Sequence, residues 1–593
     1  MFKPSLLLLL LTPSSLAATL SYNWNIGFVT ASPDGFSRQV IGINGQWPCP
    51  TIEGSVGDTV VINVTNSLGT QSTGLHFHGI NQKGSPIMDG PSGVSQCPIP
   101  PGGSFSYSFT LNEPGTYWYH SHNNGQYPDG LRGPLIVQDP KDPYKGQYDE
   151  EIVLTTSDWY HDEIPALISQ LLNTSNTQFA PPLPDALLLN DTTQAKFEFT
   201  AGKTYKIRLI SMAAFASTFI QFGGHQMKII EVDGSYTQIS TADQIRIAPA
   251  QRYTVLLTAL SSTTTNYAFL ASLDQNRDFT DTANSIYPHN ITGYIVYNEA
   301  QAYPQALEVN QWAPFDDLTL QALSGQSLLA APTKDITLNF TFGIDDAGVP
   351  RSYFNNITYV TQKVPTLFSA FTTGSQNTNP VVYGTVNPFV VSKGDIVQIV
   401  VNNFDVAIHP FHLHGHQFQV LERPASNAGA YAGETIAFLG YPMQRDTVTV
   451  NANSYVVLRF QADNPGVWLF HCHIEWHVVM GLIATIIEAP EELAGNSIPA
   501  DHQSVCQTQN IPIAGNAAGN TQNPLDLTGA NTQPPNPDNG PVFDPSCSSA
   551  GPGTCDERKR KRTLTPTPTI TTPISIPRRR RSRTVSLLED YIY

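Results

Sequence analysis

The stretch of this sequence that decides the fold is His471-Cys472-His473-Ile474-Glu475-Trp476-His477. In a β-strand, successive side chains point to opposite faces of the sheet. His471 and His473 would therefore present two imidazoles from one face, while the thiol of Cys472 points from the other. One strand then serves two metal sites that only a few covalent bonds separate, which predicts a β-protein built around coupled metal centres.

Three further groups of histidines extend this pattern along the chain. They are His76-Phe77-His78, His120-Ser121-His122 and His409-Pro410-Phe411-His412-Leu413-His414. A single His-x-His pair is a weak sign of metal binding, because any half-buried strand can carry one. Here ten of the fifteen histidines gather in four groups. Their pairs offer eight ring nitrogens, more than one ion can bind, which predicts a cluster of three metal ions between the first and last domains.

The residues around Cys472 indicate which metal binds there. One thiolate with two imidazoles, from Cys472, His409 and His477, is typical of a trigonal blue-copper centre, whereas structural zinc normally has four closed ligands. Leu482 stands ten residues after Cys472, where a weak axial thioether would otherwise be. An apolar residue at that position stabilises the cupric state less, so we expect a relatively high reduction potential.

The composition favours short strands and turns over long helices. Of 593 residues only 13% are charged, and 43 Gly and 46 Pro interrupt the chain often. The length suggests roughly three or four domains. Strand-like alternation recurs at residues 59–65, 204–210 and 395–401. We therefore predict an all-β protein of three β-sandwich domains, which lie at residues 19–140, 150–300 and 335–495.

Residues 1–18 have the three parts of a secretory signal peptide. Lys3 precedes an apolar run at residues 6–11, and small residues follow up to Ala18. The run is far shorter than the ~20 residues of a spanning helix, so we expect cleavage near Ala17 or Ala18 and no membrane anchor. Six glycosylation motifs also fit a secreted protein of the extracellular space or cell wall. They lie at Asn63, Asn173, Asn190, Asn290, Asn339 and Asn356.

Residues 510–593 are expected to form a disordered tail, because Asn, Gly, Pro and Thr dominate there and apolar periodicity is lost. Residues 556–593 carry ten Lys or Arg and four Asp or Glu, a net charge of +6. Since the whole chain carries −17, the other residues carry −23. An acidic body of this kind is unsuited to nucleic acid and accepts a cation or a neutral aromatic molecule.

The four histidine groups with their flanking residues resemble the copper motifs of the multicopper oxidases. The matching stretches are Leu75-His-Phe-His-Gly79, Tyr117-Trp-Tyr-His-Ser-His122, His409-Pro-Phe-His-Leu-His-Gly415 and the stretch from His471 to His477. The resemblance covers about residues 20–510. It implies three cupredoxin-like β-sandwiches, dioxygen as the electron acceptor, and four copper ions: one type 1, one type 2 and two type 3.

The same resemblance assigns each ligand. It implies that His409, Cys472 and His477 hold the type 1 copper, and that His76 and His412 hold the type 2 copper. The type 3 ligands would be His78, His120, His122, His414, His471 and His473.

Two acids occupy the positions of the family's proton-relay residues, Asp89 and Glu475. Reduction of dioxygen to water consumes protons, so buried carboxyls near the cluster would act as donors. Asp89 could instead be only a turn residue before Gly90, and Glu475 a surface residue or a hydrogen-bond partner of a ligand.

Six cysteines are few for a secreted chain of this length, so disulfides are not its main stabiliser. Cys97 and Cys506 match a family disulfide that ties the first domain to the C-terminal segment. Cys547 and Cys555 could close a small loop in the tail, and Cys49 has no evident partner.

The residues of these motifs are most similar to those of the ferroxidase branch of the fungal multicopper oxidases. In that branch carboxylates lie beside the type 1 histidines, because iron favours oxygen ligands. Asp405 matches one of these acids, Pro181 takes the place of a second, and a third falls near Asp278 or Asp281.

Because proline removes a ligand and leaves an apolar rim, we predict a monomeric, laccase-like phenol oxidase. Its reductant would be a small aromatic molecule, with radical coupling in pigment, melanin or aromatic polyketide synthesis. Asp405 or Asp185 would accept the phenol proton, although each could be only an exposed loop acid. The alternatives are a soluble ferroxidase that serves iron uptake and a copper-binding protein without turnover.

Overall fold

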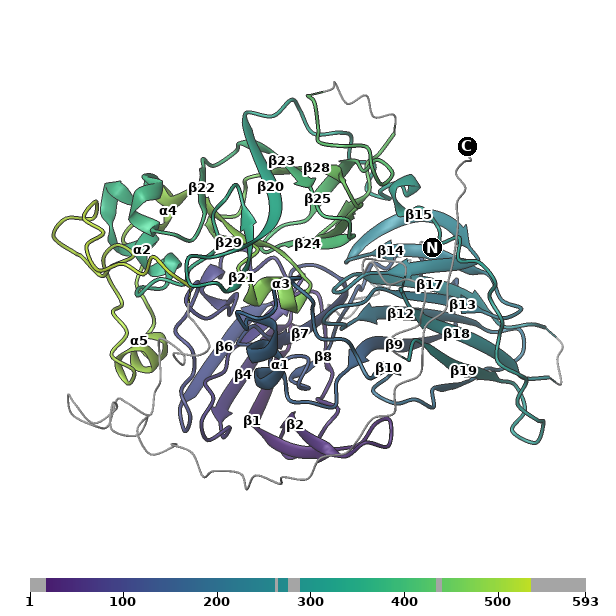
Figure 1. Ribbon diagram of the computed structural model, residues 1–593. Coiled ribbons are helices and arrows are strands. Elements are labelled where there is room, and N and C mark those ends of the chain that lie inside the picture. Colours follow the sequence, from purple (N-terminus) through teal and green to yellow (C-terminus); the bar gives the residue numbers. More distant parts are fainter. Residues whose placement is uncertain (1–16, 262–264, 276–287, 434–439, 535–593) are drawn as a thin grey trace, which may run out of the picture. The chain divides into compact units, whose positions relative to one another are not determined.

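The computed structural model describes residues 17–261, 265–275, 288–433 and 440–534. Within them the chain is built mainly of strands, which form six sheets (Figure 1). The sheets are grouped below in three pairs, in chain order. The all-β fold expected from the sequence is confirmed, while the exact limits of the domains remain predictions.

The first pair of sheets contains the strands that carry the first two histidine groups. Its four-stranded sheets have the orders β2-β1-β4-β6 and β3-β8-β7-β5. Strand β4 alternates buried and exposed side chains, as the period-two pattern at residues 59–65 predicts. The strands are β1 (Thr19–Ala31), β2 (Arg38–Ile43), β3 (Ile52–Ser55), β4 (Thr59–Asn66), β5 (Leu75–His78), β6 (Ser104–Thr110), β7 (Gly115–Ser121) and β8 (Arg132–Gln138).

The second pair has a six-stranded sheet of order β10-β9-β12-β17-β14-β15 and a five-stranded sheet of order β11-β19-β18-β13-β16. None of the histidines predicted to bind copper lies on its strands. They are β9 (Glu150–Trp159), β10 (Ala186–Leu189), β11 (Lys196–Glu198), β12 (Thr204–Ser211), β13 (Thr218–Phe222), β14 (Met227–Val232), β15 (Ser235–Ala242), β16 (Gln244–Ile247), β17 (Arg252–Thr258), β18 (Tyr267–Leu273) and β19 (Asn290–Val296).

The third pair repeats the six-plus-five arrangement, in the orders β21-β20-β23-β28-β25-β26 and β22-β30-β29-β24-β27. Its second sheet carries the last two histidine groups. The strands are β20 (Lys334–Ile344), β21 (Pro350–Phe354), β22 (Pro388–Val391), β23 (Ile396–Asn403), β24 (His409–Leu413), β25 (Phe418–Glu422), β26 (Gln444–Arg445), β27 (Thr447–Val450), β28 (Ser454–Gln461), β29 (Gly466–Cys472) and β30 (Ile483–Glu488).

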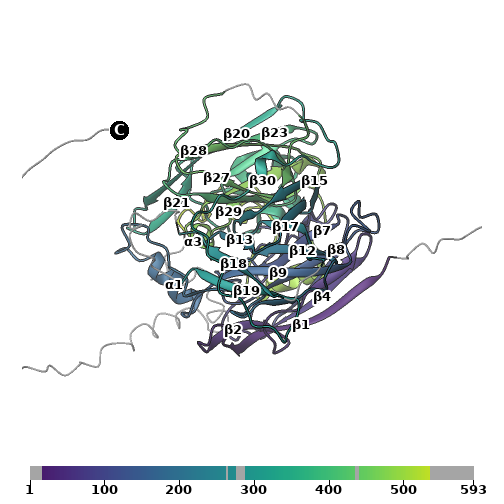
Figure 2. The same cartoon turned by 90° about the vertical axis from the view of Figure 1, so that its right-hand side faces the viewer.

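The helices are short: α1, α2 and α3 lie between strands along the chain, whereas α4 and α5 follow the last strand, β30. Helix α1 lies beside α3 in both views of the ribbon (Figures 1 and 2), and the two approach each other closely. The α-helices are α1 (Ile164–Leu171), α2 (Thr366–Thr372), α3 (Glu475–Val479), α4 (Pro490–Leu493) and α5 (Ala500–Gln507). Single 3₁₀ turns occur at Pro86–Met88, Asp317–Thr319, Gly374–Thr378 and Pro380–Tyr383. No helix in the described ranges is long and apolar enough to span a bilayer.

Two large apolar clusters bind the pairs of sheets together. One contains Ile207 of the second pair with Leu338 and Cys472 of the third. The other joins the first pair to helices α2 and α5. Burial of apolar surface on this scale is the main favourable contribution to folding. The histidine-bearing strands are therefore held within these two packed clusters.

The predicted disulfide between Cys97 and Cys506 is confirmed, and it links residues 409 positions apart in the sequence. Cys49 is a buried free thiol that donates to the Gly130 carbonyl oxygen, and burial raises the pKa of this thiol to about 12. Cys547, Cys555 and most of the signal peptide lie outside the described residues.

The segment at residues 510–534 differs from the expected disordered tail, because it packs against the 3₁₀ turn Pro380–Tyr383 and the loop residues Gln362 and Thr385. The Ala517 amide donates to the Val382 carbonyl oxygen at 2.8 Å. The buried Asn516 amide group donates to the carbonyl oxygens of Pro524 and Asp526. Asparagine side chains here supply the hydrogen bonds of a compact loop, which a search for apolar periodicity does not detect. Residues 535–593 lie outside the described ranges.

The glycosylation motifs fall mostly on accessible positions. Five of the six asparagines are exposed, whereas Asn339 is half-buried and its Oδ1 accepts a hydrogen bond from Asn402. Attachment of glycan at these sites stays a prediction, and Asn339 is the least accessible of them.

Candidate metal centres

The pairing of four buried strands brings the histidine groups into register. Strand β5 pairs with β7, which places His76 opposite His120. Strand β24 pairs with β29, which places His412 opposite His471. All residues of β5 and β24 are buried, so their imidazoles face the interior rather than water. Each sheet thus presents two adjacent histidine pairs on one face.

Histidines of the first and third pairs of sheets then meet face to face. The ring centres of His78 and His412 are 3.7 Å apart, and those of His76 and His414 are 4.0 Å apart. Further contacts across this boundary are longer, among them two at 5.3 and 5.4 Å between ring centres. These two join His122 to His471 and His120 to His473. All eight histidines predicted to hold the three-metal cluster therefore lie together.

The nitrogen atoms of this cluster fit a set of bound metal ions. The Nε2 atoms of His414 and His471 point at each other across 3.1 Å. Several other ring nitrogens are fully buried and have no hydrogen-bond partner in the described structure, which is costly unless the lone pair binds something. They are His76 Nε2, His78 Nδ1, His120 Nε2, His412 Nε2 and both ring nitrogens of His473.

Hydrogen bonds fix which nitrogen of most rings can bind a metal. The Nδ1–H groups of four histidines donate to backbone carbonyl oxygens at 2.8–2.9 Å, so their Nε2 atoms carry the lone pair. These are His76, His120, His412 and His471. His78 is reversed, because its Nε2 lies 3.3 Å from Asp446 Oδ1 and its Nδ1 is left for the metal.

Burial also keeps the imidazoles neutral, which is the form that binds metal. It lowers the pKa of His122 to about 3. The same direction holds for His78, His120, His414, His471 and His473.

The second predicted site lies on the other side of strand β29. Cys472 Sγ is 3.4 Å from His477 Nδ1 and 4.0 Å from His409 Nδ1. The two imidazole nitrogens are 3.2 Å apart. A buried thiolate with two imidazoles in a triangle is the donor set of a blue-copper centre.

Leu482 packs in the apolar cluster that contains Cys472, and its carbonyl oxygen accepts from the Cys472 amide. Its role as the axial residue stays a prediction.

Asp89 is fully buried beside the cluster. Its Oδ2 accepts from His414 Nδ1 at 2.9 Å, and its carbonyl oxygen accepts from His76 Nδ1 at 2.8 Å. It is therefore more than a turn residue before Gly90.

Glu475 is also buried rather than on the surface. It begins helix α3 and lines a cavity of about 480 Å³ together with His122. Burial raises the pKa of Glu475 to about 7, so this carboxyl can hold a proton at neutral pH.

Asp405 touches the predicted type 1 site at its outer edge. Its Oδ2 lies 3.0 Å from His409 Nε2, and 23% of its side chain is exposed. The neighbouring Phe404 and Val406 are more than half exposed, which gives the carboxylate an apolar rim. Asp185 is placed elsewhere, where its Oδ2 accepts from the His161 amide. Asp278 and Asp281 lie outside the described residues.

Aromatic side chains that the sequence did not single out cover the same site. The Phe342 ring centre is 5.1 Å from that of His477, and the Phe179 ring stacks on Phe342 at 5.7 Å. The segment that contains Pro181 therefore lies near the type 1 histidines. Asp446 and Arg252, beside the three-metal cluster, were also missed, because no spacing signal marks a charged residue that only tertiary packing buries.

Three family models described as multicopper oxidase match residues 25–142, 150–300 and 359–492. The chain is 52% identical over 530 residues to the iron transport multicopper oxidase fetC of Epichloe festucae, covering 88% of this chain and 84% of that protein. It is 40% identical over 533 residues to the iron transport multicopper oxidase FET3 of Saccharomyces cerevisiae, covering 87% and 83%.

Two solved structures are similar to the fold. The crystal structure of Fet3p, a multicopper oxidase that functions in iron import, has a TM-score of 0.83 at 37% identity and covers 87% of this chain and 99% of that one. A laccase from Botrytis aclada has a TM-score of 0.72 at 26% identity, with coverage of 83% and 92%.

These likenesses overturn the substrate predicted from the sequence. The laccase-like assignment with an aromatic reductant, and with it a part in pigment, melanin or polyketide synthesis, is wrong, because the relatives at 40–52% identity are iron transport oxidases. Loss of one carboxylate to Pro181 indicates the substrate less well than similarity to an iron transport oxidase over 88% of the chain.

The family models and the relatives agree with the histidine clusters and the thiolate site described above. The chain therefore belongs to the multicopper oxidase family, and it is a copper-dependent oxidoreductase with type 1, type 2 and type 3 copper sites that uses dioxygen as its electron acceptor.

Proposed function

We propose that this enzyme is a ferroxidase, which oxidises Fe(II) to Fe(III) while it reduces dioxygen to water. The observation that carries the proposal is the carboxylate of Asp405, which is partly exposed and lies 3.0 Å from the type 1 histidine His409. Relatives named as iron transport oxidases support the same substrate. The enzyme would serve iron uptake. It would pass through the secretory route, which is consistent with its disulfide.

The chemistry of Asp405 suits iron. Fe(II) favours oxygen ligands and Fe(III) favours them more, so an ionised carboxylate at the docking point assists loss of the electron. The hydrogen bond from His409 lowers the pKa of Asp405 against the effect of burial, which keeps the carboxylate charged. The electron can then leave iron through the carboxylate and the hydrogen-bonded imidazole.

The remaining residues take the roles that their positions support. His409, Cys472 and His477 would hold the type 1 copper, His76 and His412 the type 2 copper, and the other six clustered histidines the type 3 pair. When bound, the coppers supply one-electron acceptance and the reduction of dioxygen. His471 and His473 link the thiolate of Cys472 covalently to the cluster, while Glu475 can hold a proton beside it and Asp89 accepts a hydrogen bond from His414.

Replacement of the iron-docking carboxylate tests the proposal. Asp405→Ala should lower kcat/KM for Fe(II) by about tenfold to a hundredfold, since a hydrogen bond to a charged group is worth ~1.5–3 kcal/mol. Turnover of a substituted phenol should change much less, because a neutral aromatic does not need the charge. The measurement is oxygen consumption with each reductant.

Asp463→Asn is the matched control, since Asp463 is an exposed acid of the third pair that pairs with Lys83. It should leave Fe(II) oxidation unchanged. An Asp405→Ala enzyme that oxidises Fe(II) at the normal rate, or a wild-type enzyme that prefers phenols to iron, would contradict the ferroxidase proposal.

A second prediction concerns the missing acid. Pro181→Glu should raise kcat/KM for Fe(II) severalfold, because the segment of Pro181 lies beside Phe342 and the type 1 histidines, and a second carboxylate adds attraction for a cation. Stopped-flow bleaching of the blue absorption by Fe(II) measures the step directly. Pro181→Gln, which has the same length and no charge, should give no gain.

A further inference from the structure

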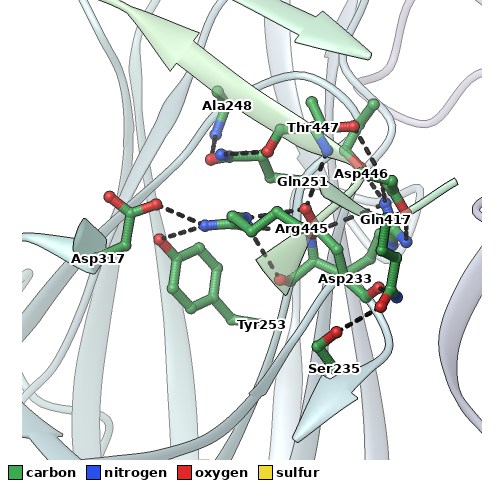
Figure 3. Close-up of polar contacts among 12 residues, drawn as sticks. Asp233, Ser235, Ala248, Gln251, Tyr253, Asp317, Gln417, Arg445, Asp446 and Thr447 are labelled. Carbon is green, nitrogen blue, oxygen red and sulfur yellow. Dashed lines mark hydrogen bonds and ion pairs between the residues drawn. The ribbon is translucent and has the colours of Figure 1, made fainter. Parts of the chain in front are cut away.

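A buried network of charges connects the second and third pairs of sheets (Figure 3). Arg445 donates from Nε to Asp233 Oδ2 at 2.8 Å and from Nη1 to Asp317 Oδ2 at 2.6 Å. Arg252 forms two parallel bonds with Asp446, from Nη1 to Oδ1 at 2.8 Å and from Nη2 to Oδ2 at 2.5 Å. Such charge-assisted, bidentate contacts are strong and directional.

One end of this network reaches the three-metal cluster. Asp446 Oδ1 lies 3.3 Å from His78 Nε2 and 3.4 Å from His412 Nδ1. The Thr447 hydroxyl donates to the same carboxylate oxygen at 2.8 Å. Because His78 donates through Nε2, its Nδ1 is directed at the cluster, so the orientation of this ring depends on where the Asp446 carboxylate is held.

Arg252 is held rigidly enough to set that position. Its Nε donates to the Thr116 carbonyl oxygen at 2.9 Å, and its Nη1 donates to the Ala250 carbonyl oxygen at 2.9 Å. Thr116 belongs to β7 of the first pair, Ala250 to the second and Asp446 to the third. The guanidinium therefore joins all three pairs of sheets at one buried point.

Gly79, directly after His78, leaves room for this contact. It has a φ of +89°, and a Cβ built there would lie 2.5 Å from Arg252 Nη2 and 2.9 Å from Asp446 Oδ2. The Arg252–Asp446 ion pair thus packs directly against the backbone next to His78.

We propose that Arg252 is a positioning residue for the three-copper cluster. Arg252 lies on β17 of the second pair of sheets, which supplies none of the predicted ligands, and it orients His78 and His412 by holding the Asp446 carboxylate in place. This rests on His78 and His412 being copper ligands, as proposed above. Without Arg252 the Asp446 carboxylate would be a buried, uncompensated charge, and the proton positions of both rings would no longer be fixed. A purely structural ion pair would instead affect folding stability and leave the coppers unchanged.

The test uses the copper-loaded enzyme with Arg252→Lys and Arg252→Met. Three quantities are measured: the rate at which a chelator removes copper, the electron paramagnetic resonance spectrum of the type 2 copper, and the melting temperature. Loss of a group that orients a ligand typically weakens metal binding about 10–100-fold. We expect Arg252→Met to release cluster copper at least about tenfold faster with an altered type 2 spectrum, Arg252→Lys to be intermediate, and the blue absorption of both to be normal.

Arg208→Met is the matched control. Arg208 lies on the neighbouring strand β12, is equally buried, and bonds to Glu151 and to the Thr116 hydroxyl. The Arg208→Met variant should be less stable than the wild type, yet keep its copper and its type 2 spectrum. If Arg252→Met does not fold, the copper release rate and type 2 spectrum of Arg252→Lys test the proposal instead. A wild-type release rate and spectrum in either folded Arg252 variant would overturn the proposal, as would equal copper loss in Arg208→Met.

Discussion

Cys472→Ser is expected to remove the blue absorption and all oxidation of Fe(II), while the protein stays folded. A serine hydroxyl remains protonated at neutral pH and is a poor ligand for a soft site, so the type 1 copper is not retained. The cluster histidines are untouched, so copper analysis should give three ions per molecule instead of the family's four. Visible absorption, metal analysis and oxygen consumption together measure the effect.

Cys49→Ser separates loss of the thiolate from loss of a buried cysteine. Cys49 is the second free thiol of the described residues, and a serine there can make the same hydrogen bond to the Gly130 carbonyl oxygen. This variant should stay blue and active. Residual Fe(II) oxidation by a folded Cys472→Ser protein would show that electrons reach dioxygen by another route.

Glu475→Gln is expected to slow the reoxidation of the reduced enzyme by dioxygen by about 100-fold, in the range that loss of a general acid usually gives. The amide keeps the size of the side chain but cannot deliver a proton beside His122. Reduction of the type 1 site by Fe(II) without oxygen should proceed at the normal rate. During steady turnover the variant should therefore accumulate in its bleached, reduced form, which stopped-flow absorption detects.

Glu113→Gln serves as the control for this variant. Burial raises the pKa of Glu113 as well, but its partner is Asn81 rather than a residue of the cluster. Its reoxidation rate should equal that of the wild type. A Glu475→Gln enzyme with normal reoxidation would assign the proton supply to another group, of which Asp89 is the nearest candidate.

The candidate copper ligands could be predicted from the sequence because they follow local spacing. His471, Cys472 and His473 follow from the alternation of a strand, and the same rule applies to the pairs at His76 and His120. The partnership of Cys97 and Cys506 came from family resemblance, and the structure confirms it.

The substrate could not be obtained in the same way. It depends on which side chains surround His409 and His477, and these come from distant segments that carry Asp405, Phe179 and Phe342. A single aligned proline was a poor guide to that surface, and relatives similar over the whole chain corrected it.

What the sequence alone determined is therefore the all-β class, the family and the four groups of candidate copper ligands. Tertiary structure decided that Asp446 and Arg252 lie beside the cluster, that Asn516 closes a compact loop in the C-terminal segment, and that Asp405 lies 3.0 Å from His409. The physical reason is that metal ligands follow the short-range periodicity of strands, whereas the burial and pairing of charged groups depend on contacts between residues hundreds of positions apart.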